Sequence, residues 1–320
     1  MSVLVYAESS SKGKFKKVAL EVTSYGKKLA EQLGTNLVVL TVNAEDASEL
    51  FEYGAEKVLA VKNEALKLLN PKIIANIIQQ AAEKESTSVA IIDSSADGLS
   101  IAPMVAVDLN AGYASNVIDL PISTNPFTVK NNAFSSKAFN FTKIVTEIKV
   151  IGLAKNSFGL KETKVDGIVE DFSPSLVQSG LSSISVDKSS GKVTIADAEI
   201  VVSGGRGLKG PENWGIIEEL ADVLGAATAC SKPVSDMEWR PHSEHVGQTG
   251  KPVSANLYIA VGISGAIQHL AGVNASKVKV VVNIDPEAPF FKAADYGVVG
   301  DAFDVLPALT EKLKVFKSNL

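Results

Sequence analysis

The chain has 320 residues, of which 46% are hydrophobic and 21% are charged, so it is long enough for about two globular domains. Its net charge of −5 argues against a nucleic-acid-binding surface, which needs clustered lysine and arginine, and its single cysteine excludes an internal disulfide. The N-terminal residues have no basic region before an apolar run, and no run of about 18 apolar residues occurs. We therefore expect a cytoplasmic protein without a signal or transit peptide, without membrane insertion and without a nucleic-acid partner.

The first half of the chain predicts strands that alternate with helices. Apolar segments typical of buried strands occur at Ser2–Ala7, Asn36–Val42, Lys57–Val61 and Ser88–Asp93. Between the first two, apolar residues recur at helical spacing from Val18 to Leu33, and Gly34 is suited to end that helix. Pro71 is suited to the first position of a second helix. This alternation predicts a doubly wound parallel sheet.

The sequence changes character near the middle of the chain. From about Ser115 to Ile151, short strand-like segments separated by Asn and Ser turns predict antiparallel strands added to the sheet. Two further segments, Val165–Asp171 and Ser182–Val186, also have strand character, and Ser189–Gly191 is suited to a break between domains. We therefore predict an N-terminal α/β domain over residues 1–190 and a second domain over residues 191–320.

The second half predicts another doubly wound unit. Its strands are expected at Glu199–Ser203, Ala226–Cys230, Leu257–Val261, Val278–Val282 and Tyr296–Val299. Asn213 or Glu212 can cap the helix after the first of these strands, and Gly225 can end it. Apolar residues from Phe303 to Phe316 predict a closing amphipathic helix. The fold class is therefore α/β, with two doubly wound Rossmann-like domains, of which the first carries added antiparallel strands.

The loops after the strands of the second unit share one edge of a parallel sheet, where such folds bind ligands. In chain order these loops are SGGRG, ACSK, VGISG, NIDP and GD. They contain serine donors at Ser203, Ser231 and Ser264. Arg206, one of only two arginines in the chain, can neutralise a pyrophosphate, and Asn283 and Asp301 can hold the edges of a ribose or adenine. Together these loops predict a dinucleotide site.

One stretch combines the features of a phosphate cradle. The polar turn Val246–Lys251 precedes the buried strand Leu257–Val261. The strand runs into the glycine-flanked loop Gly262–Gly265, and a helical pattern begins at Ala266. Glycines admit close backbone approach, and the first N–H groups of a helix attract an anion. The stretch resembles the signature L-Y-x-A-x-G-I-S-G-x-x-Q-H-x-x-G of the electron transfer flavoprotein alpha subunit family, and the resemblance extends over Ser203–Lys314.

The resemblance implies one FAD bound at the carboxyl edge of the second domain, which would be the FAD-binding domain. Carried over residue by residue, it assigns the cofactor site to Arg206, Ser231, Lys232, Val246, Gly247, Gln248, Thr249, Ser264, Gly265, Ala266, Ile267, Gln268, His269, Asn283, Asp301 and Ala302. It further implies that Thr249 lies at the flavin N5 region and His269 near the pyrimidine carbonyl. No catalytic residue and no metal is expected, because the flavin supplies the chemistry while the protein positions and tunes it.

By the same resemblance, the chain is the alpha subunit of a heterodimeric electron carrier rather than an enzyme with its own substrate. The family takes electrons from flavin dehydrogenases, usually the acyl-CoA type of fatty acid β-oxidation, and delivers them to a quinone reductase or similar acceptor. The first domain would pair with the beta subunit. Two alternatives remain: a nucleotide- or NAD-binding regulatory subunit without redox activity, and an NAD-dependent transferase, for which the loops place no base or nucleophile.

One position departs from the family pattern. The family usually has Arg after the serine that follows the second strand, where this chain has Lys232. Lysine keeps the charge but loses the planar fork that stacks on a ring, so we expect FAD to bind while the stability of the one-electron-reduced flavin changes. Elsewhere, His242 and His245 form an H-x-x-H pair without a third metal ligand, and Cys230 is expected to pack rather than react.

Overall fold

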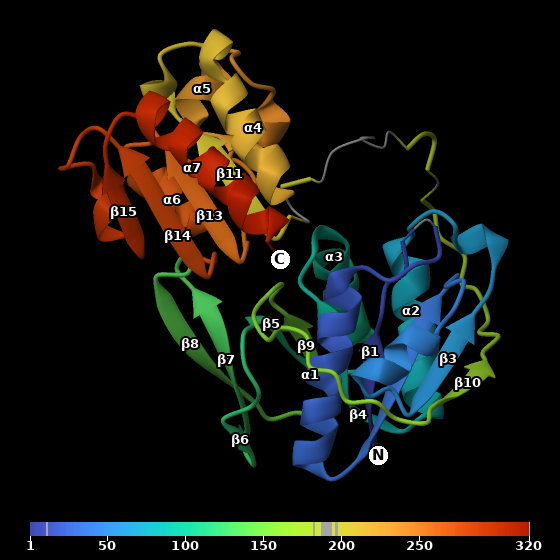
Figure 1. The fold of residues 1–320 in the computed structure, drawn as a ribbon. Coiled ribbons are helices and arrows are strands. Elements are labelled where there is room, and N and C mark those ends of the chain that lie inside the picture. The colour runs from blue at the N-terminus through green and yellow to red at the C-terminus, as the bar shows by residue number, and fades with distance from the viewer. Residues whose placement is uncertain (11, 182, 187–193, 196–197, 320) are drawn as a thin grey trace. The chain divides into compact units, whose positions relative to one another are not determined.

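The computed structural model describes residues 1–10, 12–181, 183–186, 194–195 and 198–319. The chain divides into two compact units, Met1–Ala133 with Ala138–Val186, and Phe134–Lys137 with Asp187–Leu320 (Figure 1). Both units are α/β, and the first has a large, mostly parallel sheet whereas the second has a smaller parallel one. The predicted break at Ser189–Gly191 lies outside the described residues. The domain limits 1–190 and 191–320 stay a prediction.

The sheet of the first unit has the strand order β10-β3-β2-β1-β4-β9-β5-β7-β6, with β8 paired to β7. Its strands are β1 (Ser2–Tyr6), β2 (Asn36–Val42), β3 (Lys57–Val61), β4 (Thr87–Asp93), β5 (Gly112–Val117), β6 (Ser123–Thr124), β7 (Phe127–Ala133), β8 (Ala138–Ile144), β9 (Lys149–Leu153) and β10 (Ile168–Asp171). Pairing is parallel from β10 through β5, and it is antiparallel among β5, β6, β7 and β8. The antiparallel strands predicted from the Asn and Ser turns are thus present at one end of the sheet.

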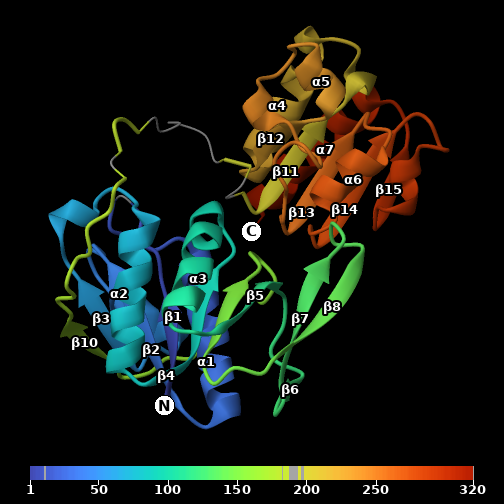
Figure 2. The same cartoon turned by 180° about the vertical axis from the view of Figure 1, so that it is seen from behind.

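Helices cover both faces of this sheet. They are α1 (Lys17–Leu33), α2 (Pro71–Lys84), α3 (Ala96–Asp108) and the short 3-10 helices η1 (Ser48–Tyr53) and η2 (Glu64–Leu66). Helix α1 packs on one face, in front of the sheet in Figure 1, and α2 and α3 pack on the other, in front in Figure 2. As predicted, Gly34 follows α1 in the left-handed conformation, and Pro71 opens α2, where the Asn70 side chain accepts a hydrogen bond from the Ile73 N–H.

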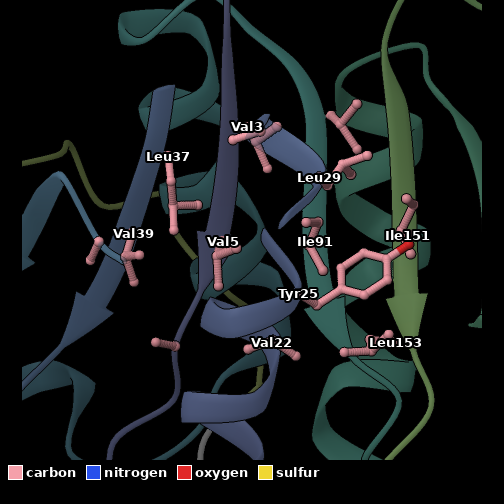
Figure 3. Packing of buried hydrophobic residues seen from close by; sticks show 14 of the residues in the cluster. Val3, Val5, Val22, Tyr25, Leu29, Leu37, Val39, Ile91, Ile151 and Leu153 are labelled. Atoms are coloured by element: carbon pink, nitrogen blue, oxygen red, sulfur yellow. The ribbon is translucent and has the colours of Figure 1, made fainter. Parts of the chain in front are cut away.

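An apolar layer fills the space between α1 and the sheet (Figure 3). Val22, Tyr25 and Leu29 lie on one side of α1 and are wholly buried against valine, leucine and isoleucine side chains of β1, β2, β4 and β9. The Tyr25 hydroxyl donates to the Asp119 carbonyl at 3.1 Å, so its polar atom is satisfied as well. Burial of each large apolar side chain contributes about 1.5–3 kcal/mol. The helical spacing read in the sequence therefore determines which face of α1 meets the sheet.

The segment after β9 differs from the prediction in two places. The expected strand Val165–Asp171 begins only at Ile168, where it pairs in parallel with β3. The prediction of a strand at Ser182–Val186 is wrong for residues 183–186, which form no strand. Ser182 lies outside the described residues. Ile184 is 99% exposed, so this apolar residue meets no layer that could bury it. Strand propensity without a neighbouring strand to pair with does not make a strand.

The second unit has a five-stranded parallel sheet in the order β12-β11-β13-β14-β15. Its strands are β11 (Ile200–Gly204), β12 (Ala227–Cys230), β13 (Leu257–Val261), β14 (Val278–Asn283) and β15 (Tyr296–Val299). Its helices are α4 (Gly215–Leu224), α5 (Lys232–Asp236), α6 (Ile267–Val273), α7 (Ala302–Ser318) and the 3-10 helices η3 (Arg206–Leu208), η4 (Pro211–Asn213), η5 (His242–Glu244) and η6 (Pro289–Lys292). Separate apolar clusters lie on the two faces of the sheet, one of them containing residues of α4 and α7.

The helix ends of this unit correct two expectations. Neither Asn213 nor Glu212 caps α4, because both belong to η4, which ends just before Trp214. Trp214 is the residue that precedes α4, and its backbone is already helical. The Asn213 amide instead donates to the Leu208 carbonyl at 2.9 Å. In the closing helix, Phe316 is 60% exposed and not part of the buried face. Gly225 ends α4 in the left-handed conformation, as predicted.

Candidate cofactor site

The carboxyl edge of the second sheet has a switch point between β11 and β13. The chain leaves β11 for β12 on one side and later returns to β13 on the other. Loops that diverge from two adjacent parallel strands open the crevice in which α/β sheets bind ligands. Here Gly205 N donates to the Val261 carbonyl (2.8 Å) and Gly207 N to the Gly262 carbonyl (3.1 Å). The two loops therefore contact each other through their backbones.

Two glycines make this close approach possible. A Cβ at Gly207 would lie 2.6 Å from the Gly262 Cα, and a Cβ at Gly262 would lie 2.8 Å from the Gly207 Cα. Gly262 also has a φ of 61°, which side-chain-bearing residues rarely adopt. Any side chain on either residue would force the loops apart, so this wall of the crevice is bare backbone.

A cavity of about 620 Å³ lies at this edge, a size typical of small-molecule sites. The predicted residues that line it are Arg206, Ser231, Lys232, Val246, Gly247, Gln248, Thr249, Ser264, Ala266, Gln268, His269 and Asn283. It is also lined by residues that the residue-by-residue assignment left out: Gly207, Pro233, Asp236, His245, Gly262, Ile263 and Asp285. Of these, Gly207, Gly262, Ile263 and Asp285 belong to loops that the sequence places at this edge of the sheet. Pro233, Asp236 and His245 lie outside those loops, and His245 adjoins the predicted residue Val246.

The remaining predicted residues do not line the cavity: Gly265, Ile267, Asp301 and Ala302. The Asp301 carboxylate accepts a hydrogen bond from the Phe303 N–H at 3.0 Å and lies 3.8 Å from the Lys209 ammonium. Ala302 is buried at the start of α7, and Ile267 is 66% exposed. An acidic residue between a strand and a helix serves as a helix cap, and this is the role that Asp301 has in the structure.

The turn that contains Gln248 and Thr249 is held by its backbone. Val246 N donates to the Cys230 carbonyl at 3.0 Å, and Gln248 N donates to the Gln268 carbonyl at 2.7 Å. These bonds tie the turn to the end of β12 and to the first turn of α6. The side chains of Gln248 and Thr249 are exposed and line the cavity. They are therefore placed to meet a ligand.

Asn283 fixes a loop through both ends of its amide. Its Nδ2 donates to the Ile263 carbonyl at 3.0 Å, and its Oδ1 accepts from Asp285 N at 3.1 Å. The side chain is 9% exposed. Asn283 thus shapes the loop after β13, and because it also lines the cavity, its predicted contact with a ligand stays a prediction.

Two cations, Arg206 and Lys232, and two carboxylates, Asp236 and Asp285, line the cavity. Arg206 is exposed, and across the described ranges no carboxylate forms an ion pair with it. Lys232 lies 3.5 Å from Asp236, with both side chains more than half exposed. The second arginine, Arg240, is engaged elsewhere, pairing with Glu218 and Glu244 at 3.1 and 2.7 Å. Arg206 and Lys232 are thus the basic residues that line the cavity.

Two neutral histidines border the cavity. His269 is 7% exposed, and its Nε2 lies 3.0 Å from the Tyr258 hydroxyl. Burial lowers the pKa of His269 to about 4, which the Val246 backbone partly opposes and the nearby His245 reinforces. Burial also lowers the pKa of His245, with His242 and Lys232 adding to the effect. Nδ1 of both rings is buried without a hydrogen-bond partner in the described part of the chain.

The other features noted in the sequence are Cys230 and the pair His242 and His245. Cys230 is wholly buried, and burial raises the pKa of its thiol to about 12, so it packs as expected. The rings of His242 and His245 lie 5.3 Å apart, and within the described ranges no group of three or more His, Cys, Asp or Glu could hold a metal ion. No helix among these residues has the length and apolar content needed to cross a membrane.

Comparison with known proteins identifies the family. Residues 3–176 match the electron transfer flavoprotein domain, and residues 194–274 match the electron transfer flavoprotein FAD-binding domain. The electron transfer flavoprotein subunit alpha of Bacillus subtilis is 35% identical over 307 residues, which cover 94% of each chain. The chain belongs to the electron transfer flavoprotein alpha subunit family.

Relatives across distant organisms agree with this membership. The electron transfer flavoprotein subunit alpha of Thermoanaerobacterium thermosaccharolyticum is 35% identical over 98% of each chain. A probable mitochondrial electron transfer flavoprotein subunit alpha of Caenorhabditis elegans is 36% identical over 89% of this chain and 86% of its own. The chain is thus an electron-transport flavoprotein of this family.

The cofactor of this flavoprotein is FAD, and the cavity suits it. The bare wall at Gly207 and Gly262 admits a flat or extended ligand at close range. The buried, unpartnered Nδ1 atoms of His245 and His269 are donors or acceptors that a ligand could satisfy. Arg206 supplies a positive charge near the glycine wall for a pyrophosphate.

Proposed function

We propose that the chain is the alpha subunit of a heterodimeric electron transfer flavoprotein, with FAD held in the cavity at the carboxyl edge of the second sheet. The proposal is supported above all by the cavity's lining, which combines a backbone wall, two cations and neutral histidines. These groups bind and tune a redox cofactor. Bound FAD supplies the one-electron chemistry, so the protein needs no nucleophile or metal of its own.

The lining residues divide into separate roles in this proposal. Arg206 neutralises the pyrophosphate, and the glycine wall beside it admits the phosphates at close range. Thr249 lies at the flavin N5 region, and His269 lies near the pyrimidine carbonyl. Lys232 provides positive charge at the ring. Donors and cations arranged in this way stabilise the reduced flavin, because it carries more negative charge than the oxidised one. Each charge-assisted hydrogen bond contributes about 1.5–3 kcal/mol.

Members of this family normally pair with a beta subunit, and we propose that the first unit provides the pairing surface. We further propose flavin dehydrogenases, of the acyl-CoA type, as electron donors and a quinone reductase or similar oxidoreductase as acceptor. Location in the cytoplasm is a further part of the proposal, based on the composition of the chain.

A visible spectrum of the chain, co-expressed with its adjacent-gene partner, tests the proposal. Flavin absorbance that passes through a red one-electron-reduced form during stepwise dithionite titration is the expected result. Direct two-electron reduction would keep the cofactor but remove the single-electron role. A colourless complex that stays colourless with added FAD would overturn the site and favour a nucleotide-binding regulatory subunit.

A further inference from the structure

The hairpin of β7 and β8 in the first unit exposes two phenylalanine rings. In the register of the two strands, Phe139 lies opposite Asn132. Phe141, two residues further along β8, lies opposite Lys130. Phe139 is 58% exposed and Phe141 is 57% exposed. Because residues two apart in a strand point to the same side, both rings belong to one face of the hairpin. This outer face is formed by Thr128, Lys130, Asn132, Phe139, Phe141 and Lys143.

The opposite face of the same hairpin belongs to the core of the first unit. Phe127 and Val129 on β7 and Ile144 on β8 are at most 5% exposed, and they belong to the apolar cluster that contains residues of α1. A sheet that packs one face on a core normally presents polar side chains on its other face. The buried face accounts for the folding of the hairpin, and it gives no reason for two phenylalanines on the outer face.

The edge of the hairpin is open as well. Among the strands that the structure describes, β8 pairs with β7 alone, so its other edge has no partner. The hairpin stands apart from helices α1, α2 and α3 in both views (Figures 1 and 2). The Lys130 ammonium lies 3.8 Å from the centre of the Phe139 ring, yet more than half of that residue stays exposed. An open edge strand with exposed aromatic rings is a surface on which another chain can pack.

The hairpin is also a basic segment of an acidic chain. Residues 120–146 include three lysines, Lys130, Lys137 and Lys143, and no aspartate or glutamate, so their net charge is +3. The whole chain has a net charge of −5, so the other residues together carry −8. Within the described ranges, none of these three lysines forms an ion pair with a carboxylate. Unpaired lysines beside apolar rings are complementary to a partner surface with carboxylates around an apolar centre.

The charge of the outer face argues against a second copy of this chain as the partner. In a symmetric dimer the same patch meets itself, which would bring the lysines of one copy against those of the other. Residues 120–146 contain no carboxylate that could offset this repulsion. Transient electron-transfer contacts are small, whereas permanent complexes of two different chains bury more apolar surface. The two phenylalanines therefore suit a stable partner of different sequence.

We propose that the outer face of the β7–β8 hairpin docks the beta subunit, with the two phenylalanine rings at the centre of the contact and the lysines paired with carboxylates of the partner. The inference rests on the proposed heterodimer, and it assigns the pairing surface to one face of one hairpin. Aromatic side chains at the centre of an interface contribute most to affinity, while charges at its rim act mainly on the association rate and on its salt dependence. The rings and the lysines are therefore expected to respond differently to substitution.

The test measures the affinity of the two subunits, with the FAD content as a separate readout. Analytical ultracentrifugation of the co-expressed complex over a dilution series gives the dissociation constant, and visible absorbance gives the FAD content. Phe139→Ser combined with Phe141→Ser should raise the dissociation constant by about 100-fold or more. At concentrations that keep the subunits together, FAD content should equal that of the wild type. The matched control is Phe316→Ser on α7, which removes a phenylalanine that is 60% exposed and should leave the dissociation constant unchanged.

A second variant tests the charges and leaves every apolar side chain in place. Lys130→Glu combined with Lys143→Glu should raise the dissociation constant by about tenfold at low salt, because carboxylates of the partner would then meet like charges. Salt screens exposed charges, so the affinity of the wild type should fall as salt is added. The affinity of the lysine variant should not fall.

The outcomes separate this proposal from the proposed function. An unchanged dissociation constant in both variants, with FAD bound, would overturn the docking surface and leave the cofactor site intact. An isolated wild-type chain that forms a dimer, lost when both phenylalanines are replaced, would assign the face to a second copy. A normal heterodimer that a dehydrogenase reduces more slowly would assign it to the electron donor. A wild-type complex without FAD would contradict the proposed function, while the dissociation constants would still decide the docking surface.

Discussion

At the scale of single residues, buried charges in this chain have dedicated partners, and Glu21 is the clearest example. Its side chain on α1 is 3% exposed. Its carboxylate oxygens accept hydrogen bonds from the backbone N–H groups of Asn156, Phe158 and Gly159, each at 2.8 Å. Three charge-assisted bonds replace the water that the carboxylate gives up on burial. Glu21 therefore fixes the loop after β9 against α1.

Glu21→Gln should lower the free energy of unfolding of the first unit by about 2–4 kcal/mol, because the amide keeps the size but loses the charge and one acceptor. Urea unfolding followed by far-UV circular dichroism measures the loss. The matched control is Glu31→Gln on the same helix, where the side chain is 43% exposed and pairs with Lys28. That change should cost about 0.5 kcal/mol. Equal costs for the two variants would contradict this account of Glu21.

His269 should make the stability of the second unit depend on pH. Its pKa is about 4 in the folded chain against an ordinary 6.5, so between these values the unfolded chain binds a proton that the folded chain does not. Stability is then complete above pH 6.5 and falls as the pH drops toward 4, by about 3 kcal/mol. Urea unfolding of the FAD-free chain at pH 7 and pH 4.5 measures this change. The free energy of unfolding should fall less between these two pH values in His269→Asn than in the wild type.

Lys232 should influence the redox potential of the flavin. A cation at the ring favours the gain of an electron, so Lys232→Ala should lower the first midpoint potential by about 60 mV or more, equivalent to about 1.4 kcal/mol. Lys232→Arg keeps the charge and should retain or raise the potential. Potentiometric titration of the FAD-loaded complex measures both. An unchanged potential in Lys232→Ala would mean that the ring lies beyond the reach of Lys232.

At the scale of elements, the site depends on the contact between the loops after β11 and β13. Gly262→Ala puts a methyl group 2.8 Å from the Gly207 Cα at a φ of 61°, so the loops must separate. FAD affinity should fall by about 100-fold, corresponding to about 3 kcal/mol of lost binding energy. The control is Gly215→Ala in α4, where nothing lies within 4 Å of the added methyl group. Equilibrium dialysis against FAD should show no change for the control.

At the scale of the whole molecule, the two units have separate cores. The first unit's apolar clusters lie on the two faces of its ten-stranded sheet, and the second unit's clusters lie on those of its five-stranded sheet. We expect FAD to stabilise only the second unit, by about 2.7 kcal/mol at a hundredfold excess over its dissociation constant. Both tryptophans, Trp214 and Trp239, belong to the second unit.

This arrangement allows the two units to be followed separately in the isolated chain. Added FAD should move the transition followed by the tryptophan emission maximum to a higher urea concentration. The part of the far-UV circular dichroism change that comes from the first unit should keep its midpoint. A single transition that shifts as a whole in both signals would show that the units unfold together.

Much of the fold could be predicted because its strands and helix ends depend on patterns of residues close together in the sequence. Apolar runs placed β2 and β3 at their observed residues, and the left-handed preference of glycine placed the ends of α1 and α4. The cavity could be predicted because loops after parallel strands must share an edge. The lack of a strand at residues 183–186 could not be predicted, since the strand character of these residues says nothing about whether a neighbouring strand is present.

The sequence by itself determined the α/β class, the glycine turns and the motif that marks a member of this family. Those features depend on residues close together in the chain. Only the tertiary structure decided that Asp301 caps α7, that Asn283 holds a loop, and that His245 reaches the cavity. It also brought Tyr258 to His269, from β13 and α6, at 3.0 Å. Such roles depend on the partners that packing supplies, and a polar side chain can satisfy several different partners equally well.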